Sequence, residues 1–191
     1  MAQKVKPKTK KKSKAKSAGP KKPATSKKRE PNAKSDAGSL EGKRAPSFSV
    51  ATDKGQTISL SKLRGKNVVL YFYPKDNTPG CTTEGLDFTK LLPSFSRQNA
   101  VVIGVSKDST DSHKKFRDKQ GLKIELGSDP DGSICNAFGV WKKKSLYGRT
   151  FMGIERSTFL IDAKGKIVRE WRKVKVAGHA QAVLDALKDA A

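Results

Sequence analysis

One cysteine is the residue of this sequence best placed to do chemistry. Cys81 lies in the segment YPKDNTPGCTTE, residues 73–84, between a strongly β-forming run and a helical pattern. Pro79 and Gly80 form a turn and begin the helix, which places Cys81 in the first helical turn. The unpaired backbone N–H groups of that turn favour an anion such as a thiolate. The position predicts a reactive thiol; a small buried cysteine at a helix start is the alternative.

The elements around Cys81 predict an α/β domain. Residues 67–73 and 100–106 are continuous β-branched and aromatic runs, typical of buried central strands, with a helix between them. The apolar positions of that helix are Leu86, Leu91, Leu92 and Phe95. Further predicted elements are a strand over 56–60 with a helical turn to residue 63, a helix from 109 or 111 to 121, a strand over 124–126, a short helix over 133–138, a hairpin of 157–161 with 166–171, and a last helix from about residue 180. This order predicts a mixed central sheet with helices on both faces.

The charge of the chain is concentrated at its N-terminal end. The 191 residues include 41 Lys and Arg against 18 Asp and Glu, a formal net charge of +23, and residues 1–45 hold 16 of the basic and 3 of the acidic side chains. We therefore predict a disordered Lys-rich tail over residues 1–44 and a folded domain over residues 45–191. Such a tail would bind nucleic acid weakly and without sequence preference, or would only be a solvated extension.

Composition excludes several classes of protein. No run approaches 18 apolar residues, so we predict no transmembrane helix and no membrane partner. Two cysteines and two distant histidines provide neither a disulfide scaffold nor a zinc site. The N-terminus lacks the apolar core of a secretory signal, which predicts a cytoplasmic protein, or a nuclear one if the source is eukaryotic.

Beyond these patterns, the sequence resembles a known family. Pro74-x-x-x-Thr78-x-x-Cys81 resembles the active-site signature of the peroxiredoxins, and YFYPKDNTPGCTTE resembles the bacterioferritin comigratory protein, or peroxiredoxin Q, subfamily. The segments SDPDGSICNAFGVW, YGRTFMGIERSTFLID and KVKVAGHAQAVLDAL are similar to that subfamily in the same order. The resemblance implies a thioredoxin-like fold, hydroperoxide substrates, and thioredoxin or a similar thiol reductant. It implies no metal, flavin or haem cofactor, and we predict a monomer.

The resemblance also implies roles for individual residues. Cys81 would be the peroxidatic cysteine, oxidised by the peroxide to sulfenic acid. Thr78 would hydrogen-bond the thiolate and the peroxide, and Pro74 would shield the pocket from water. Arg156 would stabilise the thiolate and the developing charge, whereas the residues alone would make it a surface arginine. Glu84 would position the arginine, or would only interact with the helix dipole.

The resolving thiol is where the sequence departs from the subfamily. Many members carry the resolving cysteine five residues after the peroxidatic one, and Leu86 occupies that position here. The other thiol is Cys135, which would form a disulfide with Cys81 or would be a small packed residue. We predict a one-cysteine cycle, in which an external thiol reduces the sulfenic acid, and leave the Cys81–Cys135 disulfide as the alternative.

The remaining candidates carry weaker signals. We expect His113 and His179 to be solvated or capping residues, Trp141 and Trp171 to be core or rim aromatics, and residues 142–144, all lysine, to form a solvated loop.

Two other functions compete with a peroxidase. One is a nucleic-acid-associated protein that works mainly through its polybasic tail. The other is a dithiol oxidoreductase, which would need a C-x-x-C pair, whereas Thr82, Thr83 and Glu84 follow Cys81.

Overall fold

The folded part of the chain begins before the predicted boundary at residue 45. The structure, a computed structural model, describes Met1, residues 38–146 and residues 148–190, so most of the predicted tail over residues 1–44 lies outside the described residues. Leu40 N–H donates to Glu170 Oε2 at 3.1 Å, and Gly42 N–H donates to Ile167 O at 2.8 Å. The hydrogen bonds of the domain therefore extend to Leu40.

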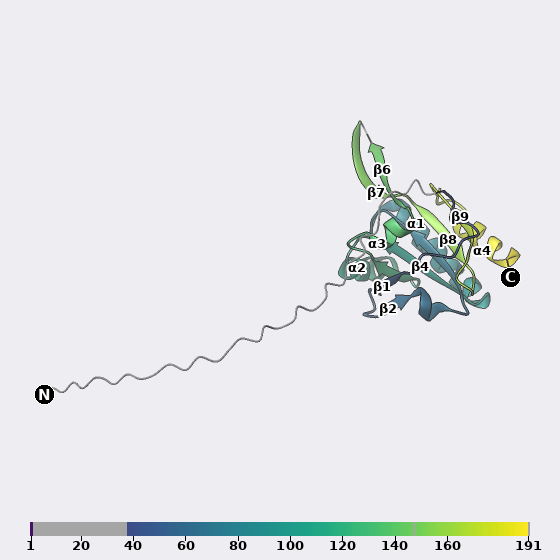
Figure 1. The fold of residues 1–191 in the computed structure, drawn as a ribbon, viewed down its shortest axis with the longest axis horizontal. Helices are drawn as coiled ribbons and strands as arrows, with labels where there is room; N and C mark the ends of the chain where they lie inside the picture. Colours follow the sequence, from purple (N-terminus) through teal and green to yellow (C-terminus); the bar gives the residue numbers. More distant parts are fainter. Residues whose placement is uncertain (2–37, 147, 191) are drawn as a thin grey trace, which may run out of the picture. The chain divides into compact units, whose positions relative to one another are not determined.

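A seven-stranded mixed sheet forms the centre of the domain (Figure 1). Its strand order is β2-β1-β5-β4-β3-β8-β9, with β3 parallel to β4 and antiparallel to β8. The strands are β1 (Ser49–Thr52), β2 (Thr57–Ser59), β3 (Asn67–Phe72), β4 (Ala100–Ser106), β5 (Glu125–Ser128), β8 (Ser157–Ile161) and β9 (Ile167–Trp171). The helices are the 3-10 helix η1 (Leu60–Leu63), α1 (Pro79–Arg97), α2 (Thr110–Gln120), α3 (Ser133–Ala137) and α4 (His179–Asp189).

Two apolar layers cover the two faces of this sheet. Side chains alternate between the faces of a strand, so Tyr71 of β3 belongs to one layer and Phe72 to the other. The layer of Tyr71 includes side chains of α1, α2 and α4, and the layer of Phe72 includes side chains of α3. The predicted α/β class, with a mixed sheet between helices, is confirmed.

Three strands and one apolar position were not predicted correctly. The sequence analysis missed β1, and it assigned residues 142–144 to a loop, whereas they lie in β6 (Trp141–Leu146), which pairs with β7 (Arg149–Ile154). The lysine run lacks alternating apolar residues because this two-stranded sheet buries little of its surface; Phe151 and Met152 are both exposed. On α1, Leu86 is 41% exposed, and Phe88 fills the core instead.

Among the described residues, no helix combines the length and the apolar character needed to cross a membrane.

Candidate active site

The end of β3 and the start of α1 position Cys81. After Tyr73 the chain leaves the sheet through an exposed loop, and Thr78 is the N-cap residue of α1, with Pro79 at the first helical position. Cys81 is therefore the third residue of the helix and is 2% exposed. Pro74, in the same loop, lies exposed to solvent. The predicted strand–turn–helix placement of the cysteine is confirmed.

The hydroxyl of Thr78 does not hydrogen-bond the Cys81 sulfur in this structure. It donates to the carbonyl oxygen of Lys75 at 3.1 Å, and the carbonyl of Thr78 accepts the N–H of Thr82 at 2.9 Å. The hydrogen bonds of Thr78 therefore fix the loop and the first helical turn. Its expected bond to the thiolate stays a prediction.

Arg156 contacts Cys81 although 75 residues separate the two in the sequence. It lies between β7 and β8, and its Nη2 is 3.2 Å from Cys81 Sγ while its Nη1 pairs with Glu84 Oε2. The guanidinium is closely packed over the start of α1, because a Cβ atom on Gly80 would lie 3.3 Å from Nη2. Burial lowers the pKa of Arg156, but the charges of Glu84 and Cys81 outweigh burial and raise it. Arg156 is therefore a positively charged group at the sulfur and not a surface arginine.

Glu84 is the buried carboxylate that holds this guanidinium. Its side chain is 1% exposed, against 16% for Arg156. Burial raises the pKa of Glu84 to about 7, although Arg156 opposes the shift. Within the described part of the chain, Glu84 Oε1 has no hydrogen-bond partner. Of the two roles left open for Glu84, the contacts favour orientation of the arginine, since the pair fixes Nη2 against Cys81.

Lys144 is a further charged group near this site, and the sequence analysis missed it. Its Nζ donates to the carbonyl oxygen of Ile154, the last residue of β7. Burial lowers the pKa of Lys144, and the positive charge of Arg156 lowers it further. Only the pairing of β6 with β7 brings this lysine toward Arg156, so the lysine run alone carried no such signal.

Cys135 is on the opposite face of the sheet from Cys81. It is fully buried on α3 in the layer of Phe72, whereas Cys81 belongs to the layer of Tyr71. Burial raises the pKa of the Cys135 thiol, and the neighbouring Asp129 raises it further. Both thiols are free. A disulfide between them would require the backbone to rearrange.

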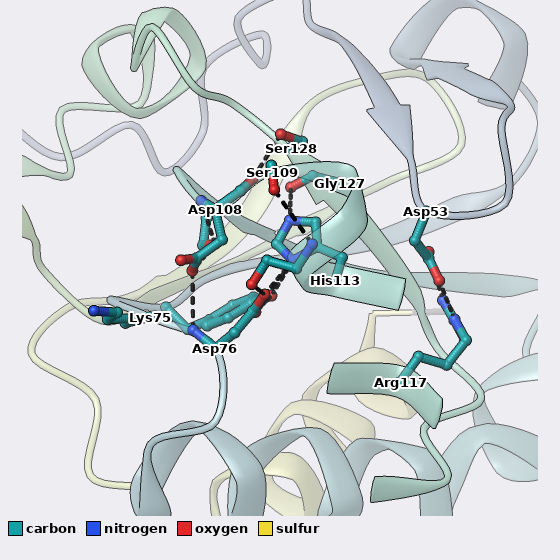
Figure 2. Close-up of polar contacts among 12 residues, drawn as sticks. Asp53, Lys75, Asp76, Asp108, Ser109, His113, Arg117, Gly127 and Ser128 are labelled. Atoms are coloured by element: carbon teal, nitrogen blue, oxygen red, sulfur yellow. Dashed lines mark hydrogen bonds and ion pairs between the residues drawn. The ribbon is translucent and has the colours of Figure 1, made fainter. Parts of the chain in front are cut away.

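The expectation that the two histidines are solvated or capping residues is wrong, because both are buried and the N-caps of α2 and α4 are Ser109 and Gly178. His113 is 0% exposed, and Figure 2 shows its ring between Asp76 and Gly127. His179 is 6% exposed and its Nε2 is 2.8 Å from Thr158 Oγ1. Burial lowers the pKa of His179 to about 4, and the charge of Arg156 adds to the effect. The side chains that contact these histidines, Asp76 and Thr158, are distant from them in sequence. The polar residues next to each histidine therefore wrongly indicated exposure to solvent.

Comparisons with known proteins agree with this arrangement. The model of the AhpC/TSA family matches residues 42–170. The chain is 51% identical to peroxiredoxin Bcp of Bacillus subtilis over 148 residues, which are 78% of this chain and 94% of that protein. It is 56% identical to peroxiredoxin Bcp of Xanthomonas campestris over 134 residues, 70% of this chain and 84% of that protein.

Solved structures give the same result for the fold. The Xanthomonas campestris bacterioferritin comigratory protein, described for its alkyl peroxide reduction activity, has a TM-score of 0.72 at 52% identity and covers 74% of this chain and 90% of its own. A C47S mutant of Xylella fastidiosa PrxQ has a TM-score of 0.74 at 46% identity and covers 80% and 98%.

The chain belongs to the AhpC/TSA family, and its relatives within that family are peroxiredoxins of the Bcp or peroxiredoxin Q type. It is a thiol-dependent peroxidase with a thioredoxin-like fold, which uses hydroperoxides as substrates and a thiol as reductant.

Proposed function

We propose that Cys81 is the peroxidatic cysteine of this peroxidase. Its thiolate attacks one oxygen of the hydroperoxide, so that an S–O bond forms as the O–O bond breaks. The sulfur becomes sulfenic acid, and the leaving oxygen takes up a proton to give water from hydrogen peroxide or an alcohol from an organic hydroperoxide. The observation that carries this assignment is the 3.2 Å contact between Arg156 Nη2 and Cys81 Sγ.

Arg156 and the residues around it supply the electrostatics of this step. Its guanidinium stabilises the thiolate in the resting enzyme and the charge that develops on the peroxide oxygens. Glu84 holds the guanidinium through Nη1, which leaves Nη2 directed at the sulfur. We assign to Thr78 a hydrogen bond to the bound peroxide, and to Pro74 the exclusion of water from the reacting sulfur.

The sulfenic acid is reduced in a one-cysteine cycle. A thiol of the reductant attacks the Cys81 sulfur, a mixed disulfide forms and water leaves; a second thiol then releases Cys81. The place of Cys135, buried on the opposite face of the sheet, supports this cycle over an internal disulfide. Thioredoxin or a similar dithiol protein is the proposed reductant.

The remaining expectations stay predictions. They are the monomeric state, the cytoplasmic location, and weak non-specific contact of the basic tail with nucleic acid. The comparisons give no support to the alternative that the chain is mainly a nucleic-acid-associated protein.

A peroxide-consumption assay coupled to a thioredoxin system tests the assignment. Cys81→Ser is expected to abolish turnover because a hydroxyl does not ionise near neutral pH. Cys135→Ser is the matched control and is expected to keep turnover with a small dithiol. Mass spectrometry after one equivalent of peroxide should find a single added oxygen on Cys81. Turnover retained in Cys81→Ser would contradict the assignment.

A further inference from the structure

A buried polar network attaches the loop that precedes Cys81, residues 74–78, to the core. Pro74, Lys75 and Asn77 of this loop are exposed, whereas the Asp76 side chain is 2% exposed. Asn77 then takes a positive φ of 56°, so the chain turns directly after Asp76 toward the helix. Asp76 is therefore the point at which this loop is attached to the core.

Three side chains donate to Asp76, one from the end of β3 and two from α2. Its carboxylate accepts from Tyr73 Oη at 2.8 Å, from Ser112 Oγ at 2.7 Å and from His113 Nδ1 at 2.9 Å. Its own N–H donates to Asp108 Oδ2 at 2.9 Å. Burial raises the pKa of Asp76, but the hydrogen bonds from His113, Ser112 and Tyr73 and the charge of His113 outweigh burial and lower it. Asp76 is therefore an ionised carboxylate with donors on both of its oxygens.

The contacts of His113 join the loop to the central sheet. Nε2 is 3.2 Å from the carbonyl oxygen of Gly127 on β5, and a carbonyl only accepts. Nδ1 faces the Asp76 carboxylate, which also only accepts when ionised. The ring of His113 is therefore fully buried, with one nitrogen at the loop and the other at the sheet (Figure 2).

We propose that His113 is a positioning residue of the peroxidase, which holds Asp76, and through it the start of α1, at the place where Cys81 meets Arg156. The connection is short: Thr78, the N-cap residue of α1, follows Asp76 by two residues. His113 touches no reacting atom, so its effect is on the geometry of the sulfur. The inference rests on the proposed role of Cys81.

Single-turnover kinetics of the full chain tests this inference. Reduced protein is mixed with excess hydrogen peroxide and the reaction is followed by tryptophan fluorescence, with Cys81→Ser as the blank. Because displacement of a reacting group by about 1 Å can cost about 100-fold in rate, His113→Gln and Asp76→Asn are each expected to slow the reaction by about 10- to 100-fold. The double variant should be no slower than the slower single variant, because both changes release the same attachment.

The matched control is a second buried ion pair of the same helix. Arg117 pairs with Asp53 one turn after His113 and does not reach the loop of Cys81 (Figure 2). Asp53→Asn is expected to lower the melting temperature and to leave the peroxide rate unchanged. Should His113→Gln and Asp76→Asn not fold, Ser112→Ala removes one of the three donors of Asp76 and keeps the other two, so we expect it to slow the reaction by only about threefold.

Alkylation of Cys81 separates positioning from general damage. Iodoacetamide requires access to the thiolate but no alignment with a peroxide. At a pH high enough to ionise an ordinary thiol without help from Arg156, His113→Gln should therefore be alkylated as fast as the wild type or faster. An unchanged peroxide rate in the variants, or an equal fall in the peroxide and alkylation rates, would overturn the positioning role of His113. The function of Cys81 would still be supported if the wild type reacts with peroxide. A wild type that does not react with peroxide would overturn both.

Discussion

Replacement of Arg156 by lysine measures how much the guanidinium contributes to the reaction at Cys81. The arginine bridges two atoms, Cys81 Sγ at 3.2 Å and Glu84 Oε2, and both contacts are buried enough to escape most solvent screening. A lysine ammonium keeps the charge but cannot direct two separate N–H groups at both atoms. Arg156→Lys therefore loses one charge-assisted hydrogen bond to the reacting sulfur.

The expected size follows from the strength of such a bond. A hydrogen bond to a charged group is worth about 1.5–3 kcal/mol, and about 1.4 kcal/mol in a barrier changes a rate tenfold. Arg156→Lys should therefore slow the single-turnover reaction with hydrogen peroxide by about 10- to 100-fold. Stopped-flow fluorescence of the reduced protein gives this rate without any reductant.

Arg117→Lys is the control for that experiment. Arg117 also pairs with a buried carboxylate, Asp53, and donates to the carbonyls of Leu122 and Ile124. Its replacement should lower the melting temperature and leave the peroxide rate unchanged. If Arg156→Lys reacts as fast as the wild type, the contact between Arg156 and the sulfur does not serve catalysis.

Four further predictions concern other parts of the molecule. Gly80→Ala places a methyl group 3.3 Å from Arg156 Nη2, so stopped-flow kinetics should find a slower peroxide reaction; an unchanged rate would mean that the guanidinium moves freely. Cys135→Ser should keep its peroxide turnover, because the cycle needs no Cys81–Cys135 disulfide. Non-reducing mass spectrometry of the oxidised wild type should find no such disulfide, and its detection would favour a two-cysteine cycle. The pKa of Glu84 is raised from 4.5 to about 7, so the folded protein binds this proton more tightly than the unfolded chain does. The contribution of Glu84 to the free energy of unfolding is therefore complete below pH 4.5 and is lost as pH rises through 7. In denaturant titrations, the free energy of unfolding of the wild type should fall by about 3 kcal/mol relative to that of Glu84→Gln between pH 4.5 and 7. Equal pH profiles for the two proteins would refute the raised pKa of Glu84. Removal of residues 1–37, which hold 14 of the 41 Lys and Arg, should weaken low-salt binding to duplex DNA and keep turnover; equal DNA binding at matched salt would exclude a nucleic-acid role for the tail.

Local sequence was sufficient for the elements whose signals lie within a few residues. The β-branched run of β4 and the Gly121 end of α2 are where the sequence placed them, and of the two predicted starts of α2 the N-cap is Ser109. The hairpin of β8 and β9 also follows its turn residues, and the pattern from Pro79 to Cys81 placed the thiol at a helix start. In each case the determining physics is short-range: side-chain periodicity, fixed backbone angles and capping.

Weak local signals explain the elements that were missed. In β6 and β7, stability comes from backbone pairing, such as Trp141 with Ile154, and the lysines show no alternation to indicate it. The burial of His113 had no local signal either, because its partners Asp76 and Gly127 belong to the loop after β3 and to β5.

The sequence alone therefore determined that Cys81 is a thiol at a helix start, because turn and helix propensities act between neighbours in the chain. Only the tertiary structure decided what surrounds that thiol. The pairing of β3 with β8 brings Arg156 to the sulfur across 75 residues, and the packing of α1 and α3 in different apolar layers puts Cys135 on the opposite face of the sheet. Such contacts depend on strand order and register, which many distant residues set together and no short segment encodes.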